Sequence, residues 1–217
     1  MTPSKIPKSK KKNFSSFTYA EAFKQLNLTD LIPWELAATP MEPSAFFKER
    51  LHRLEQIFDL QSYEESKKLL IDAICEEAML ITEHLKIWKG AQLDSDTTAG
   101  YVDYLIAERK RYLDIPMLCI IEAKKDNFEQ GLAQCLVEMQ ACQWQNHQVK
   151  HDTDILGIVT NGEGWQFYKL LITGIVHETP LYSVGDMNLL LGRLRYIFQL
   201  CEQNLLQKNI PKTRLEL

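Results

Sequence analysis

The chain has 217 residues, of which 45% are hydrophobic and 25% are charged, a composition typical of a globular protein with its own core. Its formal net charge of −4 excludes a general attraction to nucleic acid, so any nucleic-acid surface must be a local basic patch. No apolar run approaches the roughly 20 residues of a membrane span, and no signal-peptide core follows the basic start. The five cysteines stand singly, without a CxxC pair, which indicates buried thiols. We therefore expect a soluble, cytoplasmic protein that does not interact with membranes.

The N-terminal quarter predicts a tail followed by two helices. Lysines crowd among Ser and Pro at the start, so residues 1–17 are expected to form a basic disordered tail. This tail is either an electrostatic arm for phosphates or a solubilising segment. Thr18 suits the start of a short helix, and prolines separate it from a second helix near residues 44–58. We assign residues 18–60 to a helical extension without recognisable chemistry.

Residues 61–207 show the pattern of a layered α/β domain, and residues 208–217 form a C-terminal tail. The expected elements are, in chain order, a helix at 63–85, strands at 87–93, 100–108 and 116–124, a helix at 127–147, strands at 155–160 and 165–171, and a helix at 186–207. Strand 116–124 is apolar on both faces until its end, which favours a central strand covered on both sides. The helix after it suits a crossover connection. The sequence therefore predicts a mixed β-sheet flanked by helices.

Charged side chains interrupt these apolar strands at three positions. Glu122 and Lys124 are two residues apart, so they lie on one face where the strongest strand ends. Asp103 lies among apolar residues on the preceding predicted strand. Two carboxylates at a sheet edge can hold Mg²⁺, while a lysine orients the attacking water or stabilises a charged phosphorane. The alternative is that Glu122 and Lys124 form a structural ion pair and that Asp103 faces solvent.

Glu77 is a further candidate acid, on the long helix that precedes these strands. At 100° per residue it falls on the apolar side of the helix with Leu70, Ile74 and Ile81. A carboxylate buried without a partner is costly. Glu77 is therefore expected either to join the acids of the strands or to pair with a nearby lysine or arginine.

The order of these residues resembles the signature of a known superfamily. Gly100-Tyr101-Val102-Asp103, followed by an apolar strand that ends in Glu122-Ala123-Lys124, is similar to the GxxD…ExK pattern of PD-(D/E)xK nucleases. Within that superfamily, the likeness is to the nuclease domain of the motor subunits of type I restriction enzymes. It covers about residues 64–171. The resemblance implies a restriction-endonuclease-like fold and Mg²⁺-dependent hydrolysis of phosphodiester bonds, with Mn²⁺ able to replace Mg²⁺.

The resemblance also implies roles for single residues. Asp103 and Glu122 would bind the metal, and Lys124 would position the nucleophile. Glu77 would be the third metal ligand that family members often add from the preceding helix, and Gln134 loosely matches a glutamine that follows the motif. No GxxxxGK[ST] loop occurs, so we expect a stand-alone nuclease that acts on nucleic acid, with DNA the expected substrate, and has no ATPase motor.

Other functions fit the same pattern. One alternative is a catalytically silent protein of the nuclease fold that binds nucleic acid or a separate partner protein. Another is an assembly subunit, which the long amphipathic helices favour. A homodimer is compatible with each of these functions, and the sequence does not distinguish DNA from RNA or defence from repair.

Overall fold

A computed structural model of the chain describes residues 11–124 and 127–207. The elements are, in chain order, β1 (Lys12–Asn13), the 3₁₀ turn η1 (Phe14–Ser16), α1 (Tyr19–Leu26), β2 (Ile32–Pro33), α2 (Ala45–Ile57), α3 (Glu64–Met79), β3 (Leu85–Asp94), β4 (Thr98–Glu108), β5 (Met117–Ala123), α4 (Phe128–Gln148), β6 (Ile155–Thr160), β7 (Gly164–Leu170), β8 (Val176–Glu178), β9 (Tyr182–Ser183), the 3₁₀ turn η2 (Val184–Asp186) and α5 (Met187–Leu206). None of the described helices combines the length and the apolar composition that crossing a bilayer needs.

The described strands form one mixed sheet of nine strands. The order along the sheet is β1-β4-β5-β6-β7-β8-β2, with β3 paired to β4 and β9 paired to β7. Strands β3, β4 and β5 are antiparallel neighbours, whereas β5 and β6 run parallel and are joined by α4. Strands β6 and β7, which match the strands predicted at 155–160 and 165–171, form an antiparallel hairpin. The prediction of a mixed sheet flanked by helices is therefore confirmed.

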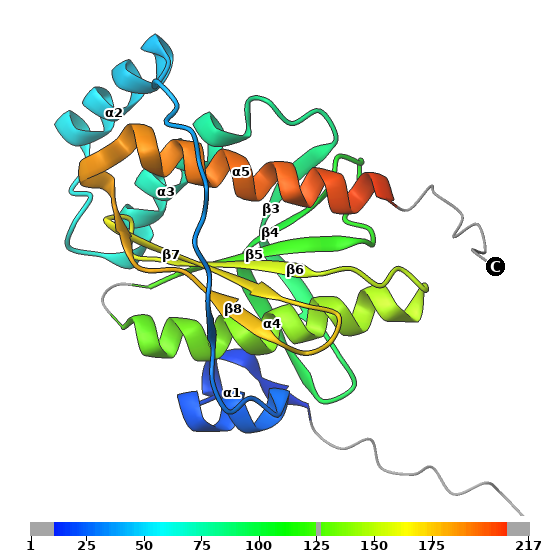
Figure 1. Ribbon diagram of the computed structural model, residues 1–217. Helices are drawn as coiled ribbons and strands as arrows, with labels where there is room; N and C mark the ends of the chain where they lie inside the picture. Colours follow the sequence, from blue (N-terminus) through cyan, green and yellow to red (C-terminus); the bar gives the residue numbers. More distant parts are fainter. Residues whose placement is uncertain (1–10, 125–126, 208–217) are drawn as a thin grey trace, which may run out of the picture.

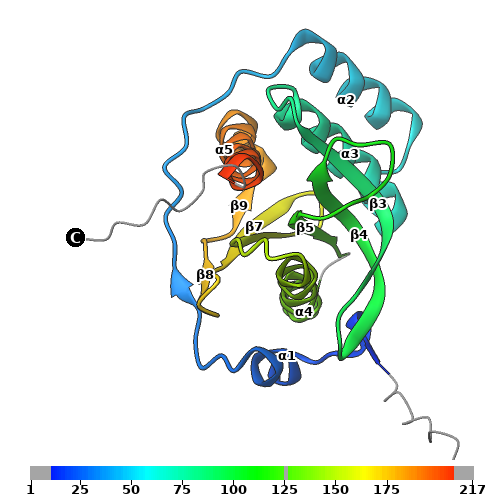
Figure 2. The same ribbon diagram turned by 90° about the vertical axis from the view of Figure 1, so that its right-hand side faces the viewer.

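Helices cover both faces of this sheet (Figures 1 and 2). Helix α4 lies on one face with α1 outside it, and their apolar side chains form one of the two core clusters. Helices α3 and α5 lie on the other face with α2 outside α3, and they form the second cluster. Strand β5 contributes to both clusters and is buried along its whole length. The expectation of a central, doubly covered strand is thus confirmed.

Local hydrogen bonds explain where the helices begin and end. Thr18 and Glu21 form a reciprocal capping box at α1, and the Asn127 side chain accepts a hydrogen bond at the start of α4. Helix α3 ends at Met79, earlier than expected, because the Met79 carbonyl accepts hydrogen bonds from Thr82. The Glu83 amide, which would have continued the helix, donates to Glu202 on α5 instead.

The expected N-terminal tail is wrong for its last seven residues, 11–17. Phe14 and Phe17 are buried in the cluster around α4, and β1 pairs in parallel with the start of β4. Burial of these two aromatic side chains therefore holds residues 11–17 against the core, although most residues next to them in the sequence are polar. Of the tail lysines, Lys11 is paired with Asp94 and Lys12 with Glu21. Residues 1–10, with Lys5, Lys8 and Lys10, and the C-terminal tail 208–217 lie outside the described residues.

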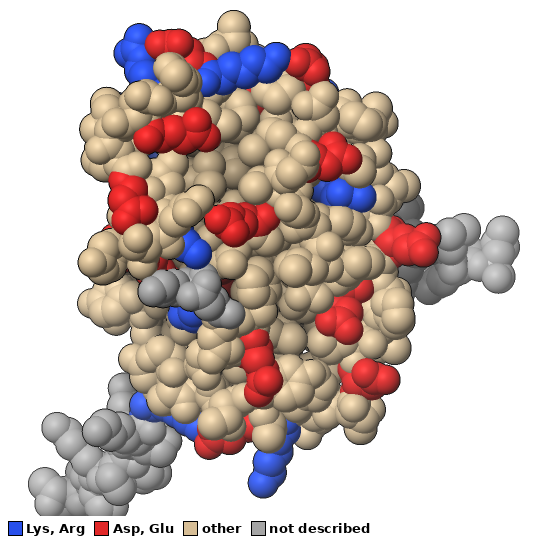
Figure 3. Space-filling model, turned by 90° about the vertical axis from the view of Figure 1, so that its left-hand side faces the viewer, with Lys and Arg blue, Asp and Glu red and all other residues tan. Residues whose placement is uncertain are grey.

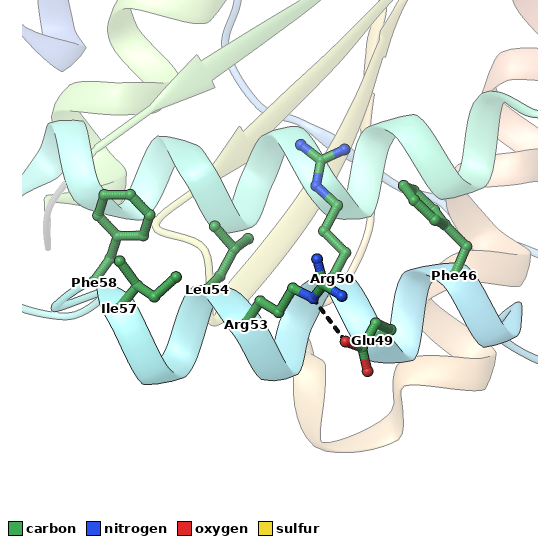
Figure 4. Close-up of a pocket in the computed structure, with 7 residues that line it drawn as sticks. All are labelled: Phe46, Glu49, Arg50, Arg53, Leu54, Ile57 and Phe58. Carbon is green, nitrogen blue, oxygen red and sulfur yellow. Dashed lines mark hydrogen bonds and ion pairs between the residues drawn. The ribbon is translucent and has the colours of Figure 1, made fainter.

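The helical extension contacts both sides of the molecule. Helix α1 packs on α4, β2 pairs with β8 at the edge of the sheet, and α2 packs on α3 through its buried Phe47. The outer side of α2 leaves Phe46, Ile57 and Phe58 exposed. Figure 4 shows them among the side chains of α2 that line a hollow, together with Arg50 and Arg53. One side of α2 therefore packs on α3, and the other side leaves apolar side chains exposed.

Close packing of α5 against the extension gives a test of this arrangement. A Cβ atom at Gly192 would overlap the backbone carbonyl of Thr39, and the neighbouring Met41 amide donates to the Asn188 carbonyl of α5. We expect Gly192→Ala to lower the free energy of unfolding by about 1–3 kcal/mol, because overpacking outweighs the roughly 1 kcal/mol by which alanine is favoured inside a helix. Urea unfolding measures the change.

The control variant is Gly185→Ala, since the nearest atom to its added Cβ would be 3.5 Å away. An unchanged midpoint for Gly192→Ala would show that α5 and the 39–41 segment are not packed in this way.

Candidate functional site

Side chains from β4, β5 and α4 meet in one polar network at the end of the central strand. The Lys124 Nζ atom donates to Glu122 Oε1 at 2.5 Å and to Gln134 Oε1 at 3.1 Å. The Asp103 Oδ2 atom accepts a hydrogen bond of 3.0 Å from the Ala123 amide. The structure therefore brings together Asp103, Glu122, Lys124 and Gln134, four of the five residues that the sequence singled out.

The backbone explains why Asp103 reaches this point. The pairing of β4 with β5 ends at Tyr104 and Ile121, whereas β5 remains paired with β6 to its last residue. The Ala123 amide, which no longer has a partner on the β4 backbone, bonds the side chain of Asp103 instead. The network thus fills the place where two strands separate.

A glycine on α4 lets the helix approach the same place. A Cβ at Gly131 would lie 2.7 Å from Val159 Cγ1 and 3.0 Å from Lys124 Cγ. Real Cβ atoms do not come this close to their neighbours, so a larger residue at position 131 would push α4 away from β5 and β6. Gly131 therefore holds Gln134, one turn further along, within reach of Lys124.

Burial shapes the charges of the network. Glu122 is fully buried, and its burial together with the nearby charge of Asp103 raises the pKa of its carboxyl group. Burial acts to lower the pKa of Lys124, but the carboxylates of Glu122 and Asp103 outweigh it and raise that pKa. Lys124 is therefore held as a cation, and it is the main counter-charge of the Glu122 carboxylate.

Sequence reasoning missed Glu138, which belongs to the same network. Gln134 Nε2 donates to Glu138 Oε1 at 2.9 Å, and Glu138 is fully buried. Burial, followed by the charge of Glu122, raises the pKa of Glu138 well above its usual range, so Glu138 holds its proton. Glu138 lies four residues after Gln134 and hence on the same helix face, a spacing that could have revealed it.

Sequence reasoning also missed Lys68 on α3. Its Nζ atom lies 3.0 Å from Asp103 Oδ1 and 2.8 Å from Glu65 Oε1, and its side chain is only 15% exposed. Glu64, at 3.7 Å from the same Nζ, is the acid of α3 that lies nearest to this ammonium after Glu65. The helix that precedes the strands thus contributes a cation to Asp103.

Glu77 lies elsewhere, so the prediction that it joins Asp103 and Glu122 as a metal ligand is wrong. Its Oε1 atom accepts from the Ser44 amide at 2.7 Å, and its Oε2 atom accepts from the Ser44 hydroxyl at 2.9 Å. Ser44 is the cap of α2, so the carboxylate lies at the positive end of a helix dipole. Glu77 follows Lys68 by nine residues, which separates them by roughly 13 Å along the helix.

The remaining acids can accommodate a divalent cation. In the part of the chain that the structure describes, no group of three or more His, Cys, Asp or Glu side chains is arranged to hold a metal. Mg²⁺ in proteins is often bound by only one or two carboxylates and keeps several waters. Asp103 Oδ1 and Glu122 Oε1 each already face an ammonium group, and Glu122 Oε2 is buried without a hydrogen-bond partner among the described residues. The donor set fits a cation bound by two carboxylates.

The described residues form no continuous basic patch on the face near the site that Figure 3 shows. Figure 3 shows the face at which α4 begins and the β6–β7 hairpin turns. Acidic side chains are scattered over it, and the lysines and arginines drawn there do not form a continuous patch. Attraction of a polyanion to this face would therefore depend on the site and on a few local cations.

The fold and the network define the protein coarsely, as a mixed α/β protein with a buried carboxylate–lysine centre at the end of a central strand. Comparison with models of protein families finds no match, and comparison with curated proteins finds none either.

The proton on Glu138 leads to a prediction about pH. The folded protein keeps this proton above the unfolded pKa of about 4.3, whereas the unfolded chain loses it, so stability falls as the pH rises above that value. A glutamine side chain at this position would be neutral at every pH and could still bond Gln134. We expect Glu138→Gln to reduce this fall in stability, with the largest gain in melting temperature at the highest pH.

Thermal unfolding between pH 4 and pH 9 measures this effect, with the exposed Glu55→Gln as the matched control. Equal pH profiles for Glu138→Gln and the wild type would contradict a proton on Glu138.

The position of Glu77 gives a second prediction. Glu77→Gln replaces an acceptor by a donor beside the Ser44 amide, so we expect it to lower the free energy of unfolding by about 1–3 kcal/mol. The binding of Mn²⁺, measured by calorimetry, should be unchanged. Glu83→Gln, on an exposed side chain, is the control. Weaker Mn²⁺ binding at unchanged stability would place Glu77 in the site after all.

Proposed function

We propose that this chain is a Mg²⁺-dependent nuclease of the PD-(D/E)xK type, with a restriction-endonuclease-like core, that hydrolyses phosphodiester bonds of nucleic acid, with DNA as the expected substrate. The observation that carries the proposal is the contact between Lys124 and Glu122 next to Asp103, at the point where β4 and β5 separate. Two acids and a lysine in this order also carry the sequence resemblance. The succession of α3, β3, β4, β5, α4 and β6 supports the fold that the resemblance implies.

Each residue of the network has a role in this proposal. Asp103 and Glu122 would hold the cation, which supplies a Lewis acid for the phosphoryl oxygen and lowers the pKa of a water molecule. The ammonium of Lys124 would orient the attacking water and stabilise the charge that develops on the phosphorane. Gln134 and Glu138 would act as positioning residues, because Glu138 fixes the amide of Gln134 and this amide fixes Lys124 Nζ.

The charge of the network agrees with a metal requirement. Asp103 lies against Lys68 and Glu122 lies against Lys124, so neither ammonium group is left without a carboxyl partner. Ammonium groups that are already paired attract a phosphodiester only weakly, whereas two added positive charges would attract it. Under the proposed function, substrate binding at the centre therefore depends on the cation.

One observation bears on a second function, that of a silent nuclease-fold protein that binds nucleic acid or a partner without cleaving, and it favours the protein partner. The face in Figure 3 has no continuous basic patch among the side chains it draws from the described residues. A protein that binds DNA at low salt but never cleaves it with Mg²⁺ or Mn²⁺ would have this second function.

The decisive variant is Lys124→Met, which keeps the apolar stem and removes the ammonium. We expect cleavage of single- and double-stranded DNA with Mg²⁺ or Mn²⁺ to fall by about two to three orders of magnitude, as when one group that stabilises transition-state charge is lost. The measurement is the initial rate of cleavage on gels, with the melting temperature as a check of folding.

Lys89→Met is the matched control, because Lys89 also forms a short ion pair, with Asp72, outside the network. Cleavage by Lys124→Met at the wild-type rate would remove Lys124 from the mechanism and with it the proposed function.

A further inference from the structure

Lys68 forms an ion pair with Asp103, the residue that the proposed function assigns as a metal ligand. Its Nζ atom lies 3.0 Å from Asp103 Oδ1, and the other oxygen of Asp103 already accepts the Ala123 amide. Both side chains are largely buried, with 15% of Lys68 and 19% of Asp103 exposed, so water screens this pair only weakly. A divalent cation on Asp103 Oδ1 would meet the ammonium of Lys68 at the same oxygen.

Two cations on one carboxylate oxygen repel each other strongly at such short range. A carboxylate oxygen has lone pairs for more than one donor, but a second positive charge within about 4 Å would oppose the first. Binding of a divalent cation at Asp103 therefore requires that Lys68 moves.

The structure also contains the place to which Lys68 can move. Glu65 Oε1 lies 2.8 Å from Lys68 Nζ, and Glu64 Oε1 lies 3.7 Å from it. Both acids are in the first turn of α3, and both are more exposed than Asp103. A rotation of the flexible lysine side chain towards them keeps the ammonium paired while it frees Asp103.

We propose that Lys68 is an internal competitor for the metal: it pairs with Asp103 in the metal-free protein and moves to Glu64 and Glu65 when a divalent cation binds. This inference rests on the proposed function, because it takes Asp103 as a metal ligand. Under this inference Lys68 weakens metal binding. After the metal binds, the Lys68 ammonium stays close to the site, paired with Glu64 and Glu65.

The test measures Mn²⁺ binding to the full-length protein without substrate, by titration calorimetry and by the electron paramagnetic resonance signal of free Mn²⁺. We expect Lys68→Met and Lys68→Gln to lower the dissociation constant of Mn²⁺ roughly tenfold or more, because the competing ammonium is gone. Lys68→Gln keeps a hydrogen-bond donor for Asp103, so it decides the question if Lys68→Met does not fold.

Loss of any nearby positive charge could strengthen metal binding through space, and Lys89→Met controls for this. Lys89 pairs with Asp72, four residues after Lys68 on α3, at 2.7 Å. The gain should be at most about twofold for Lys89→Met, and it should shrink in 0.5 M KCl, where the Debye length is only roughly 4 Å. The gain at Lys68 should persist at that salt concentration.

The outcomes separate this inference from the proposed function. If the wild type binds Mn²⁺ and cleaves DNA, but both Lys68 variants bind Mn²⁺ with wild-type affinity or no better than Lys89→Met, the competition is refuted and the nuclease stands. If the wild type shows no binding and a Lys68 variant does bind, the competition is supported. If neither the wild type nor a Lys68 variant binds Mn²⁺ and none cleaves, both proposals fail.

Discussion

The burial of Glu122 is the constraint on which the rest of the centre depends. A carboxylate that is removed from water must be given a cation, a proton or several hydrogen bonds, because an isolated buried charge is not tolerated. Lys124 supplies the cation at 2.5 Å, and the raised pKa of Glu138 keeps this neighbouring acid uncharged. Gln134 joins these two partners by accepting from the lysine and donating to the acid. One charged position at the end of an apolar strand thus explains why Lys124, Gln134 and Glu138 lie together in the interior.

Much of this fold follows from patterns that are local in the sequence. The central strand β5 shows its burial in an unbroken apolar run, and Asn161 and Gly162 mark the turn of the β6–β7 hairpin. The two-residue spacing of Glu122 and Lys124 fixes their common face. Strands β2, β8 and β9 have only two or three residues each, which is too short for a periodic pattern to be visible.

The errors at the candidate site have physical causes of a different kind. Helical phase placed Glu77 on the inner side of α3, which is right, but phase does not tell how far along the axis a residue lies from the strands. Lys68 was overlooked because a long side chain can reach a site from a helix that does not face it squarely. Phe14 and Phe17 carry the signal that residues 11–17 belong to the folded part, since two buried aromatic rings outweigh the polar residues around them.

The extension, residues 18–60, connects the two helical layers on opposite faces of the sheet. It starts on the outer surface of α4, passes the edge of the sheet where β2 pairs with β8, and ends on α3, where Ser44 bonds Glu77 (Figure 2). During synthesis Ile32 of β2 must wait for its partner His177, which lies far later in the chain. Contacts of such high sequence separation slow folding, because the loop must close before the contact can stabilise it. The contact between β2 and β8 therefore forms only after most of the sheet has been synthesised.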